Sequence, residues 1–309
     1  MADIKGLKNI GIIGAGRIAH SLVPALIKAG YKVASVSGAS KESVKSLVTK
    51  NKIKNTSATI ADTIKECGII FIALPDHAIE QAASEIARAK NLKGKLFIHL
   101  SGSKTVASLK ALSRKGGAAA GIHIMQTFPG RRPVTVKGCY ASVEGNSSSS
   151  KSAARKIASD LGTIPFYIEG DEKMLLHIMC VFASNFINAG YYNALLLHRK
   201  IKSKIPPVEK LLYPLSITNL NNIKNEGIFN SLSGPIARKD YDTVNAHLDK
   251  LFALGRKEDK IKDVLESYTI QTLSLLALNA EAKGKIKNVN STKLNSGRNR
   301  NEGNKGRQK

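Results

Sequence analysis

The sequence predicts an α/β protein, in which a doubly wound, mostly parallel Rossmann sheet is followed by an all-helical C-terminal domain. Three observations lead to this fold class. A glycine-rich turn joins a strand-like segment to a helical one near the N-terminus, strand and helix patterns then alternate, and only helical patterns follow. With 309 residues the chain has room for two domains. We expect a Rossmann-like domain over 1–168, a helical domain over 169–281 and a disordered basic tail over 282–309.

The glycine turn lies inside a complete β-α-β unit. Apolar residues from Lys8 to Ile13 predict the first strand, and Tyr31 to Val36 reads as the second. Between them, Gly14, Gly16 and Ala19 have the G-x-G-x-x-A spacing of a dinucleotide-binding turn. The first glycine permits a sharp exit from the strand, the second lets backbone approach a pyrophosphate, and the alanine lets the helix pack closely.

The following helix N-terminus offers unpaired N–H groups to phosphate. We therefore expect the whole turn to bind a dinucleotide, through Gly14, Ala15, Gly16, Arg17 and Ile18. A glycine turn that binds nothing is the less favoured alternative.

The end of the second strand discriminates between NAD and NADP. An NAD site would place a carboxylate there for the ribose hydroxyl, but Ser37, Ser40 and Lys41 come before the first acid, Glu42. Hydroxyls and a lysine suit a 2′-phosphate, so NADP is the expected cofactor. Ser40 can instead cap the helix that begins at Lys41, and both roles are compatible.

The remaining sheet elements alternate with short helices. The strands are expected at Gly68–Leu74, Lys95–Leu100, Ala118–Ile124, Gly138–Glu144 and Ile164–Ile168. The helices between them are expected at Thr59–Glu66, Ile79–Ala89, Val106–Leu112 and Lys151–Leu161. Beyond Asp171 we expect helices alone, at Glu172–Arg199, Val208–Ile223, Asn245–Leu254 and Lys260–Ala282.

Polar residues follow the strands where the ligand of such a sheet lies, at the carboxyl ends. Leu74, Pro75 and Asp76 follow the third strand, Ser101 follows the fourth, and His123 ends the fifth. We expect the first four to contact the cofactor and His123 to join the reaction. Helix capping is an equally favoured role for Asp76 and Ser101, and a hydrogen-bonded structural histidine is an even alternative for His123.

The formal net charge of +25 raises the question of nucleic acid. About a third of the excess lies in the tail, and the chain has no helix-turn-helix or zinc signature, so we expect no dedicated nucleic-acid binding. Three scattered cysteines fit a reducing cytoplasm and no metal site. No run of eighteen apolar residues occurs, the N-terminus does not read as a signal peptide, and we expect no membrane segment.

Six motifs in order give the chain a family resemblance. They are the glycine turn, Ala-Leu-Pro-Asp from Ala73, His-Leu-Ser-Gly-Ser from His99, His-Ile-Met-Gln-Thr-Phe from His123, Leu-His-Ile-Met-Cys-Val-Phe-Ala-Ser-Asn-Phe from Leu176, and Leu-Ser-Gly-Pro-Ile-Ala-Arg-Lys-Asp from Leu232. Together they resemble two-domain proteins with a Rossmann-like N-terminal domain and a helical C-terminal domain of unknown function. That family is similar to deazaflavin-dependent NADP oxidoreductases, pyrroline-5-carboxylate reductases and ketopantoate reductases, with a C-terminal domain like that of 6-phosphogluconate dehydrogenase.

The resemblance implies hydride transfer between NADP and a small carbonyl or imine substrate, and a homodimer formed through the helical domain. Related enzymes carry Lys and Asn four residues apart on a helix, whereas here Lys173 is followed at that spacing by His177, and Asn185 comes eight residues later. His177 is suited to donate the proton, Lys173 to stabilise negative charge and Asn185 to orient the nicotinamide. A solvated Lys173 and a half-buried, packed His177 are the alternatives.

Two further roles stay open at the level of the sequence. Arg238 can bind a carboxylate or lie on the surface, and Asp240 or Asp242 can cap the helix that leads to His247. A protein that binds NADP without turnover, as a sensor or interaction protein, is the alternative to the reductase.

Overall fold

The computed structural model describes residues 9–53, 59–89 and 91–298, without the side chains of 283 and 285–298. Two compact units make up the chain, Met1–Asn185 and Phe186–Lys309. The helix after the last strand belongs to the first of these units, and the expected domain boundary at 168/169 stays a prediction.

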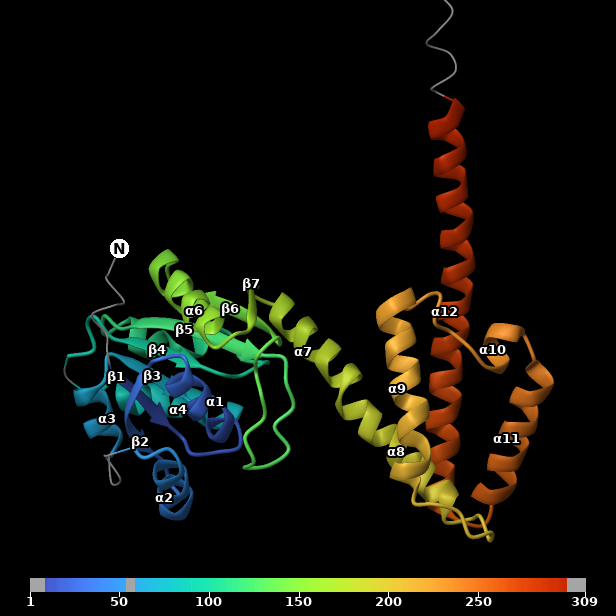
Figure 1. Ribbon diagram of the computed structural model, residues 1–309, viewed down its shortest axis with the longest axis horizontal. Coiled ribbons are helices and arrows are strands. Elements are labelled where there is room, and N and C mark those ends of the chain that lie inside the picture. Colours follow the sequence, from blue (N-terminus) through green and yellow to red (C-terminus); the bar gives the residue numbers. More distant parts are fainter. Residues whose placement is uncertain (1–8, 54–58, 90, 299–309) are drawn as a thin grey trace, which may run out of the picture. The chain divides into compact units, whose positions relative to one another are not determined.

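The first unit contains a seven-stranded sheet in the order β2-β1-β3-β4-β5-β6-β7 (Figure 1). The strands are β1 (Asn9–Ile13), β2 (Lys32–Ser37), β3 (Ile69–Ile72), β4 (Leu96–His99), β5 (Ala118–Ile124), β6 (Tyr140–Gly145) and β7 (Ile164–Tyr167). All neighbours pair in parallel except β5 and β6, which are antiparallel. The predicted doubly wound, mostly parallel sheet is confirmed.

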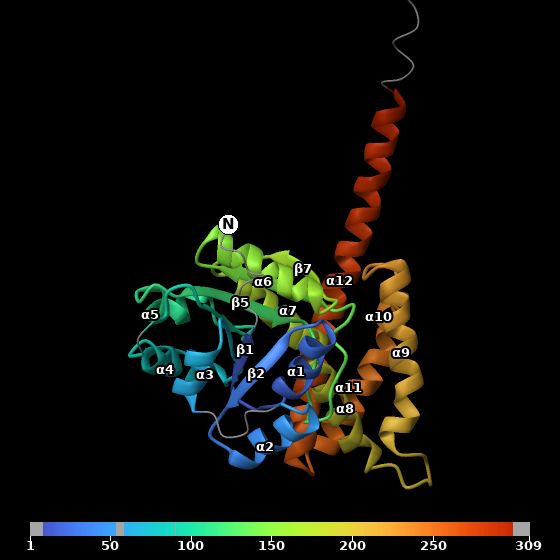
Figure 2. The same ribbon diagram turned by 60° about the vertical axis from the view of Figure 1, so that its left-hand side comes forward.

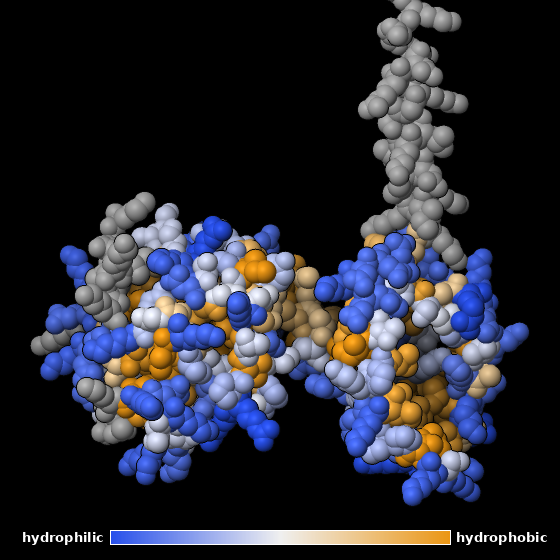
Figure 3. Space-filling view, in the orientation of Figure 1, coloured by the Kyte–Doolittle hydropathy of each residue, from blue (hydrophilic) through white to orange (hydrophobic). Residues whose placement is uncertain are grey.

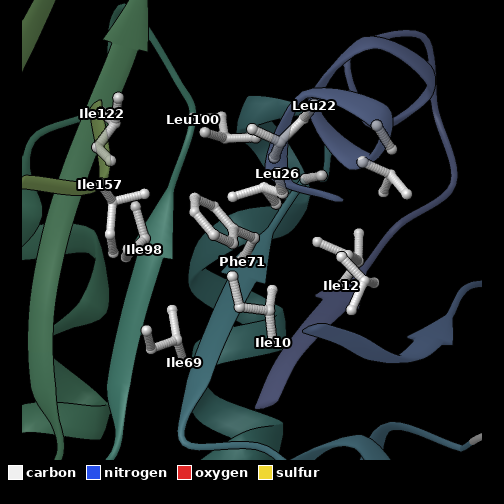
Figure 4. Close-up of a cluster of buried hydrophobic side chains, with 14 of the residues drawn as sticks. Ile10, Ile12, Leu22, Leu26, Ile69, Phe71, Ile98, Leu100, Ile122 and Ile157 are labelled. Carbon is white, nitrogen blue, oxygen red and sulfur yellow. The ribbon is translucent and has the colours of Figure 1, made fainter. Parts of the chain in front are cut away.

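Helices cover both faces of this sheet, because successive side chains of a strand point to opposite sides. Ile69 and Phe71 of β3 join one core cluster, whereas Ile70 and Ile72 join the other. The first cluster includes side chains of α1 (Ala19–Lys28), α2 (Lys41–Lys50) and α6 (Ser148–Asp160). Figure 4 shows part of it, with Leu22 and Leu26 of α1 beside Phe71.

The opposite face is covered by shorter helices. They are α3 (Ile60–Glu66), α4 (Asp76–Ile86), the 3₁₀ helix η2 (Val106–Leu109) and α5 (Lys110–Ser113). Figure 2 shows α3, α4 and α5 gathered on this side of the sheet. Thr59 starts α3 with a capping box to Asp62, so the helix begins where the sequence predicts. Two of these segments depart from expectation. The helix α4 begins at Asp76, three residues before the predicted start at Ile79, and the first turn of segment 106–113 is 3₁₀ rather than α-helical.

The long helix expected over Glu172–Arg199 is interrupted. The structure has α7 (Glu172–Ala183) and α8 (Asn185–His198), separated by Ser184 with φ −133° and ψ −65°. The Ser184 hydroxyl donates to the Cys180 carbonyl at 2.7 Å, a back-bond of the kind that bends helices. The division between the two units falls at this break.

The second unit consists of helices, as predicted. They are the rest of α8, α9 (Val208–Glu226), α10 (Pro235–Arg238), α11 (Tyr241–Gly255) and α12 (Asp259–Arg298). Its core includes Leu196, Leu251, Ile261 and Val264. The single-turn helix α10 is not among the predicted helices. The α12 backbone is helical as far as Arg298, whereas the sequence predicts disorder over 282–309; residues 299–309 lie outside the described part of the chain.

One helical stretch among the described residues, Glu172–His198, is apolar and long enough to cross a membrane, judged by length and composition alone. It spans the break at Ser184 and both α7 and α8. Much of its apolar surface is exposed, at Met174, Leu175, Ile178, Met179, Phe182, Phe186, Ile187 and Tyr192.

Candidate functional site

The glycine turn has the backbone geometry that its sequence predicts. Gly14 has φ +105°, and a Cβ there would lie 2.4 Å from the Ala73 carbonyl oxygen. Its N–H donates to the Ser37 carbonyl at 2.7 Å, which fixes the turn against β2. Gly16 differs, because a Cβ there would meet only the Ala73 oxygen, at 4.0 Å. Space for a ligand is therefore open at Gly16 and closed at Gly14.

The other turn residues lie around this opening. Arg17 is exposed, Ala15 is buried, and the half-buried Ile18 takes the N-cap position of α1. Leu74 approaches the turn from β3, since its Cδ2 would be 3.0 Å from a Cβ on Gly14. Pro75 is exposed beside it and occupies the N-cap position of α4.

A cavity of about 910 Å³ lies beside the turn, in the first unit. Ser37, Gly38 and Lys41 line it from the end of β2, and Leu74 lines it from the end of β3. The Ser37 side chain is 2% exposed, and its hydroxyl has no hydrogen-bond partner among the described residues. An unpaired buried hydroxyl and an exposed lysine at one end of the cavity fit a polar, anionic ligand.

Ser40 is engaged elsewhere. It caps α2, accepting the Ser43 N–H at 3.1 Å, and its hydroxyl donates to Glu42 at 3.0 Å. The capping alternative is thus what the structure shows for Ser40. Lys45 also lines the cavity, one turn after Lys41, and sequence reasoning missed it. The i, i+4 spacing of the two lysines on α2 was the available signal.

The polar residues after β3 and β4 meet at the sheet edge. The Ser103 hydroxyl donates to the Asp76 carboxylate, so the two loops are joined. Asp76 is the first residue of α4 and does not serve as its N-cap. Ser101 accepts the N–H groups of Ser103 at 3.2 Å and Lys104 at 2.9 Å, which holds the loop closed.

His123 and His177 converge on this loop. A Cβ built on Gly102 would lie 2.6 Å from His177 Nδ1 and 2.8 Å from His123 Nε2, so both nitrogens face the same point above the glycine. The two rings are edge to face, with centroids 5.9 Å apart. The Nδ1 atoms of both histidines are buried without a hydrogen-bond partner among the described residues. The structure therefore brings together two of the four candidate catalytic residues.

Burial lowers the pKa of His123 to about 4, and the charges of Lys173 and His177 add to the effect. His123 is thus a neutral imidazole near pH 7. In that state it can accept or donate one hydrogen bond, but it is not a cationic proton donor.

Lys173 is neither solvated nor directed into open space. Its side chain is 1% exposed, and its ammonium group donates to Glu144 Oε1. Burial lowers the pKa of Lys173, while the Glu144 charge acts in the opposite direction. On its other side, Glu144 Oε1 lies 3.5 Å from Nε2 of His99, which is fully buried.

Glu144 and His99 were not among the residues predicted for the site. Both lie in strands, where an alternating pattern leaves open whether a polar residue faces solvent or a buried neighbour. Asn185 is exposed at the break after α7 and accepts from the Ser184 hydroxyl at 3.0 Å. Its side-chain partner in the described part of the chain is Ser184 rather than either histidine.

Two sequence alternatives outside this cluster are resolved. Asp240 caps α11 by accepting the Thr243 N–H at 3.1 Å, as predicted. Arg238 is exposed and lies 3.9 Å from the Asp240 carboxylate, which is the surface role. No group of three or more His, Cys, Asp or Glu residues in the described part of the chain could hold a metal ion.

Comparison with known protein families finds a match in each part of the chain. Residues 9–102 match the family described as NADP oxidoreductase, coenzyme F420-dependent, and residues 139–274 match the domain of unknown function DUF2520. The first match supports an NAD(P)-dependent oxidoreductase, and together they confirm the predicted resemblance. No curated protein matches the chain.

Solved structures share the fold. Protein BF3122 of Bacteroides fragilis, a candidate NADP oxidoreductase, is 22% identical over 87% of this chain and 98% of its own, with a TM-score of 0.73. A reductive aminase from Aspergillus terreus, solved with NADPH and ethyl-5-oxohexanoate, is 15% identical over 91% and 94%, with a TM-score of 0.56. A pyrroline-5-carboxylate reductase from Coxiella burnetii is 14% identical over 87% and 98%, with a TM-score of 0.53.

Gly14 and Gly16 should respond differently to substitution. Gly14→Ala places a methyl group against the Ala73 carbonyl at positive φ, so we expect a destabilisation of more than about 1 kcal/mol. Gly16→Val projects into the opening, so the protein should keep its melting temperature and lose NADPH binding. Thermal unfolding and NADPH fluorescence titration measure the two effects. A stable Gly16→Val protein with undiminished NADPH affinity would remove the turn from the cofactor site.

Proposed function

We propose that the chain is an NADP-dependent reductase that transfers hydride to or from a small carbonyl or imine compound. The single observation that carries this proposal is the convergence of His123 and His177 on Gly102, at the end of the segment that matches the NADP oxidoreductase family. A protein that only bound the cofactor would not need two half-buried histidines at that edge.

The residues present fit NADP. Gly16 and the α1 N-terminus leave room for the pyrophosphate, and Lys41 and Lys45 supply positive charge beside the unpaired Ser37 hydroxyl. No carboxylate occupies the end of β2, where one would favour NAD. Bound NADPH would supply the hydride. The chain itself must then supply a proton, because reduction of a carbonyl or imine needs one.

His177 is the proposed proton donor. It is half-buried on α7, and its Nδ1 faces the space above Gly102. His123 lies across that space as a neutral imidazole, so it is suited to hold the substrate oxygen or nitrogen rather than to protonate it as a cation. Asp76 and Ser103 close the neighbouring side of the edge through their hydrogen bond.

The resemblance to ketopantoate reductases makes a 2-oxo acid derivative one substrate class. The imine-reducing enzymes that share the fold make a cyclic or secondary imine another, and the family match adds a deazaflavin. Oxidation of NADPH, followed by absorbance, against a panel of these three classes would discriminate among them. The rival proposal, an NADP-binding sensor, would survive only if no member of the panel were turned over.

We further propose that the protein acts as a homodimer through its helices, in the cytoplasm, with no membrane or nucleic-acid partner. Exposed large apolar side chains gather on the helices of the second unit (Figure 3), and such surfaces are typical of sites where proteins associate. On α9 they are Leu211, Tyr213, Leu215, Ile217, Leu220 and Ile223. A second copy of the chain would cover them, and the same explanation serves for the exposed apolar side of Glu172–His198.

Cofactor preference tests the NADP assignment. NADPH should bind at least tenfold more tightly than NADH, a difference of about 1.4 kcal/mol in binding free energy. Lys41→Glu should reduce that preference by repelling the 2′-phosphate. Lys65→Glu makes the same charge change on α3, away from the cavity, and should leave it unchanged. Calorimetry measures the affinities of both cofactors for all three proteins; equal affinities for the two cofactors in the unmodified protein would refute the assignment.

Removal of the proposed donor tests the chemistry. His177→Ala should lower kcat by about 100- to 10,000-fold, the usual contribution of general acid catalysis, with NADPH affinity nearly intact. His198→Ala removes a half-buried histidine at the end of α8, whose Nε2 lies 2.8 Å from the Pro206 carbonyl oxygen, and is the matched control. Full activity of His177→Ala on an established substrate would move the donor role to His123, Lys173 or a bound water.

The oligomeric state tests the apolar surface. Sedimentation at micromolar concentration should give the mass of a dimer. Leu215→Glu places a charge on a side chain that is 68% exposed on α9, and it should dissociate the dimer. Ile164→Glu makes a similar change on β7 of the first unit and should not. A monomer in the unmodified protein would end this proposal without affecting the assignment of the cofactor.

A further inference from the structure

The Glu144 carboxylate lies where several parts of the candidate site meet. It projects from β6, is 3% exposed, and uses both oxygens. Oε1 accepts from the Lys173 ammonium group and lies 3.5 Å from His99 Nε2, while Oε2 accepts the Val106 N–H at 2.8 Å. One carboxylate thus joins β6 to α7, to the end of β4 and to the start of η2.

Each of these partners supports a side of the space above Gly102. Lys173 lies one helical turn before His177 on α7, and residues four apart share a helix face. Val106 begins η2, which directly follows the loop containing Gly102. Glu144 therefore bonds both to the helix that carries His177 and to the segment that follows Gly102.

His123 forms the third side of the space above Gly102, and strand β5 connects it to Glu144. A Cβ on Gly121 would lie 2.6 Å from Glu144 Oε1 and 2.8 Å from His99 Nε2, so the buried group packs directly against that strand. Gly121 and His123 are two residues apart and face the same side of the sheet. Among the side-chain contacts of the described first unit, those of Glu144 connect β6 to both β4 and α7.

We infer that Glu144 and Lys173 are positioning residues, which hold His177 above Gly102 beside His123. The inference deepens the proposed function and rests on it for the role of His177. It also changes the role of Lys173, whose charge is neutralised by a buried carboxylate rather than offered to substrate. The carboxylate of Glu144 is the counter-ion of Lys173. Burial alone would raise the pKa of Glu144, yet the neighbouring His99 and the Lys173 charge lower it.

The test is a double-mutant cycle with Lys173→Met, Glu144→Gln and the combination of the two, in the full chain. Each single variant breaks the pair and should lower kcat by about 100-fold, the order of loss that a misplacement near 1 Å produces. The combined variant should be no slower than the slower single variant, because both changes remove the same contact. NADPH affinity should stay largely unchanged in all three. Lys151→Met, which breaks the exposed pair with Glu169, is the control and should keep full activity.

A spectroscopic readout separates this inference from the proposed function. NMR titration of the His177 imidazole, assigned with His177→Ala, should show altered shifts in Lys173→Met and Glu144→Gln but not in Lys151→Met. This measurement needs no substrate, so it decides the positioning role even if no compound is turned over. Lys173→Arg keeps the positive charge beside Glu144, so this variant should fold even if Lys173→Met does not. It should retain most of the activity and the His177 signal of the unmodified protein.

Three outcomes would overturn the inference. The first is unchanged His177 shifts in both single variants. The second is a Glu144→Gln protein as active as the unmodified one while Lys173→Met is slow, since a lysine that acted on substrate would be freed rather than displaced. The third is a loss of activity in the combined variant that equals the product of the two single losses.

Discussion

The buried charge of Glu144 is the constraint on which the geometry of the candidate site depends. A carboxylate that loses its water must be compensated on both oxygens. Here the Lys173 ammonium group compensates Oε1 and the Val106 N–H compensates Oε2, while His99 Nε2 lies 3.5 Å from Oε1. None of these partners is adjacent to Glu144 in sequence. Satisfying one charge therefore fixes the relative positions of β4, β6, η2 and the first turn of α7.

Stability alone gives no reason for such an arrangement. Replacing a buried ion pair by apolar side chains of similar volume is often neutral or stabilising, whereas removing one partner costs about 3–5 kcal/mol. The hydrophobic clusters on both faces of the sheet already hold the strands and helices together. The ion pair adds a restriction on geometry, because a buried charged group has few acceptable positions and an apolar contact has many. A site that must hold two imidazoles over one glycine benefits from that restriction.

Much of the first unit could be predicted from the sequence, since its strands are continuous apolar runs and its glycine turn has a known spacing. The residues that could not be predicted share a cause. Ser184 interrupts a helix through a hydrogen bond to Cys180, and nothing in the apolar period of Glu172–Arg199 distinguishes that serine from an ordinary helical one. Glu144 ends a predicted strand. Its partners in the fold lie 29 to 45 residues away in sequence.

The role of Lys173 could not be predicted from the sequence either. Local pattern gave two roles for it, a solvated helix start or a substrate-facing cation, and both assume that the side chain reaches open space. The fold places it instead against a carboxylate on β6. His177, one turn later, was correctly placed on the same helix face, but its neighbour His123 and the opening between them depend on the sheet register.

Two glycines without unusual backbone angles complete the arrangement. Gly121 leaves room for the Glu144–His99 contact, and Gly102 leaves room for the two imidazoles that follow from it. Neither needs a positive φ, so the requirement is for the missing side chain and not for backbone freedom. A methyl group at Gly121 would push against the carboxylate, and through Lys173 and Val106 the displacement would reach both sides of the space above Gly102. The candidate site is therefore sensitive to a residue that touches neither histidine, because the space for the charge and the space for the chemistry are set by the same strand ends.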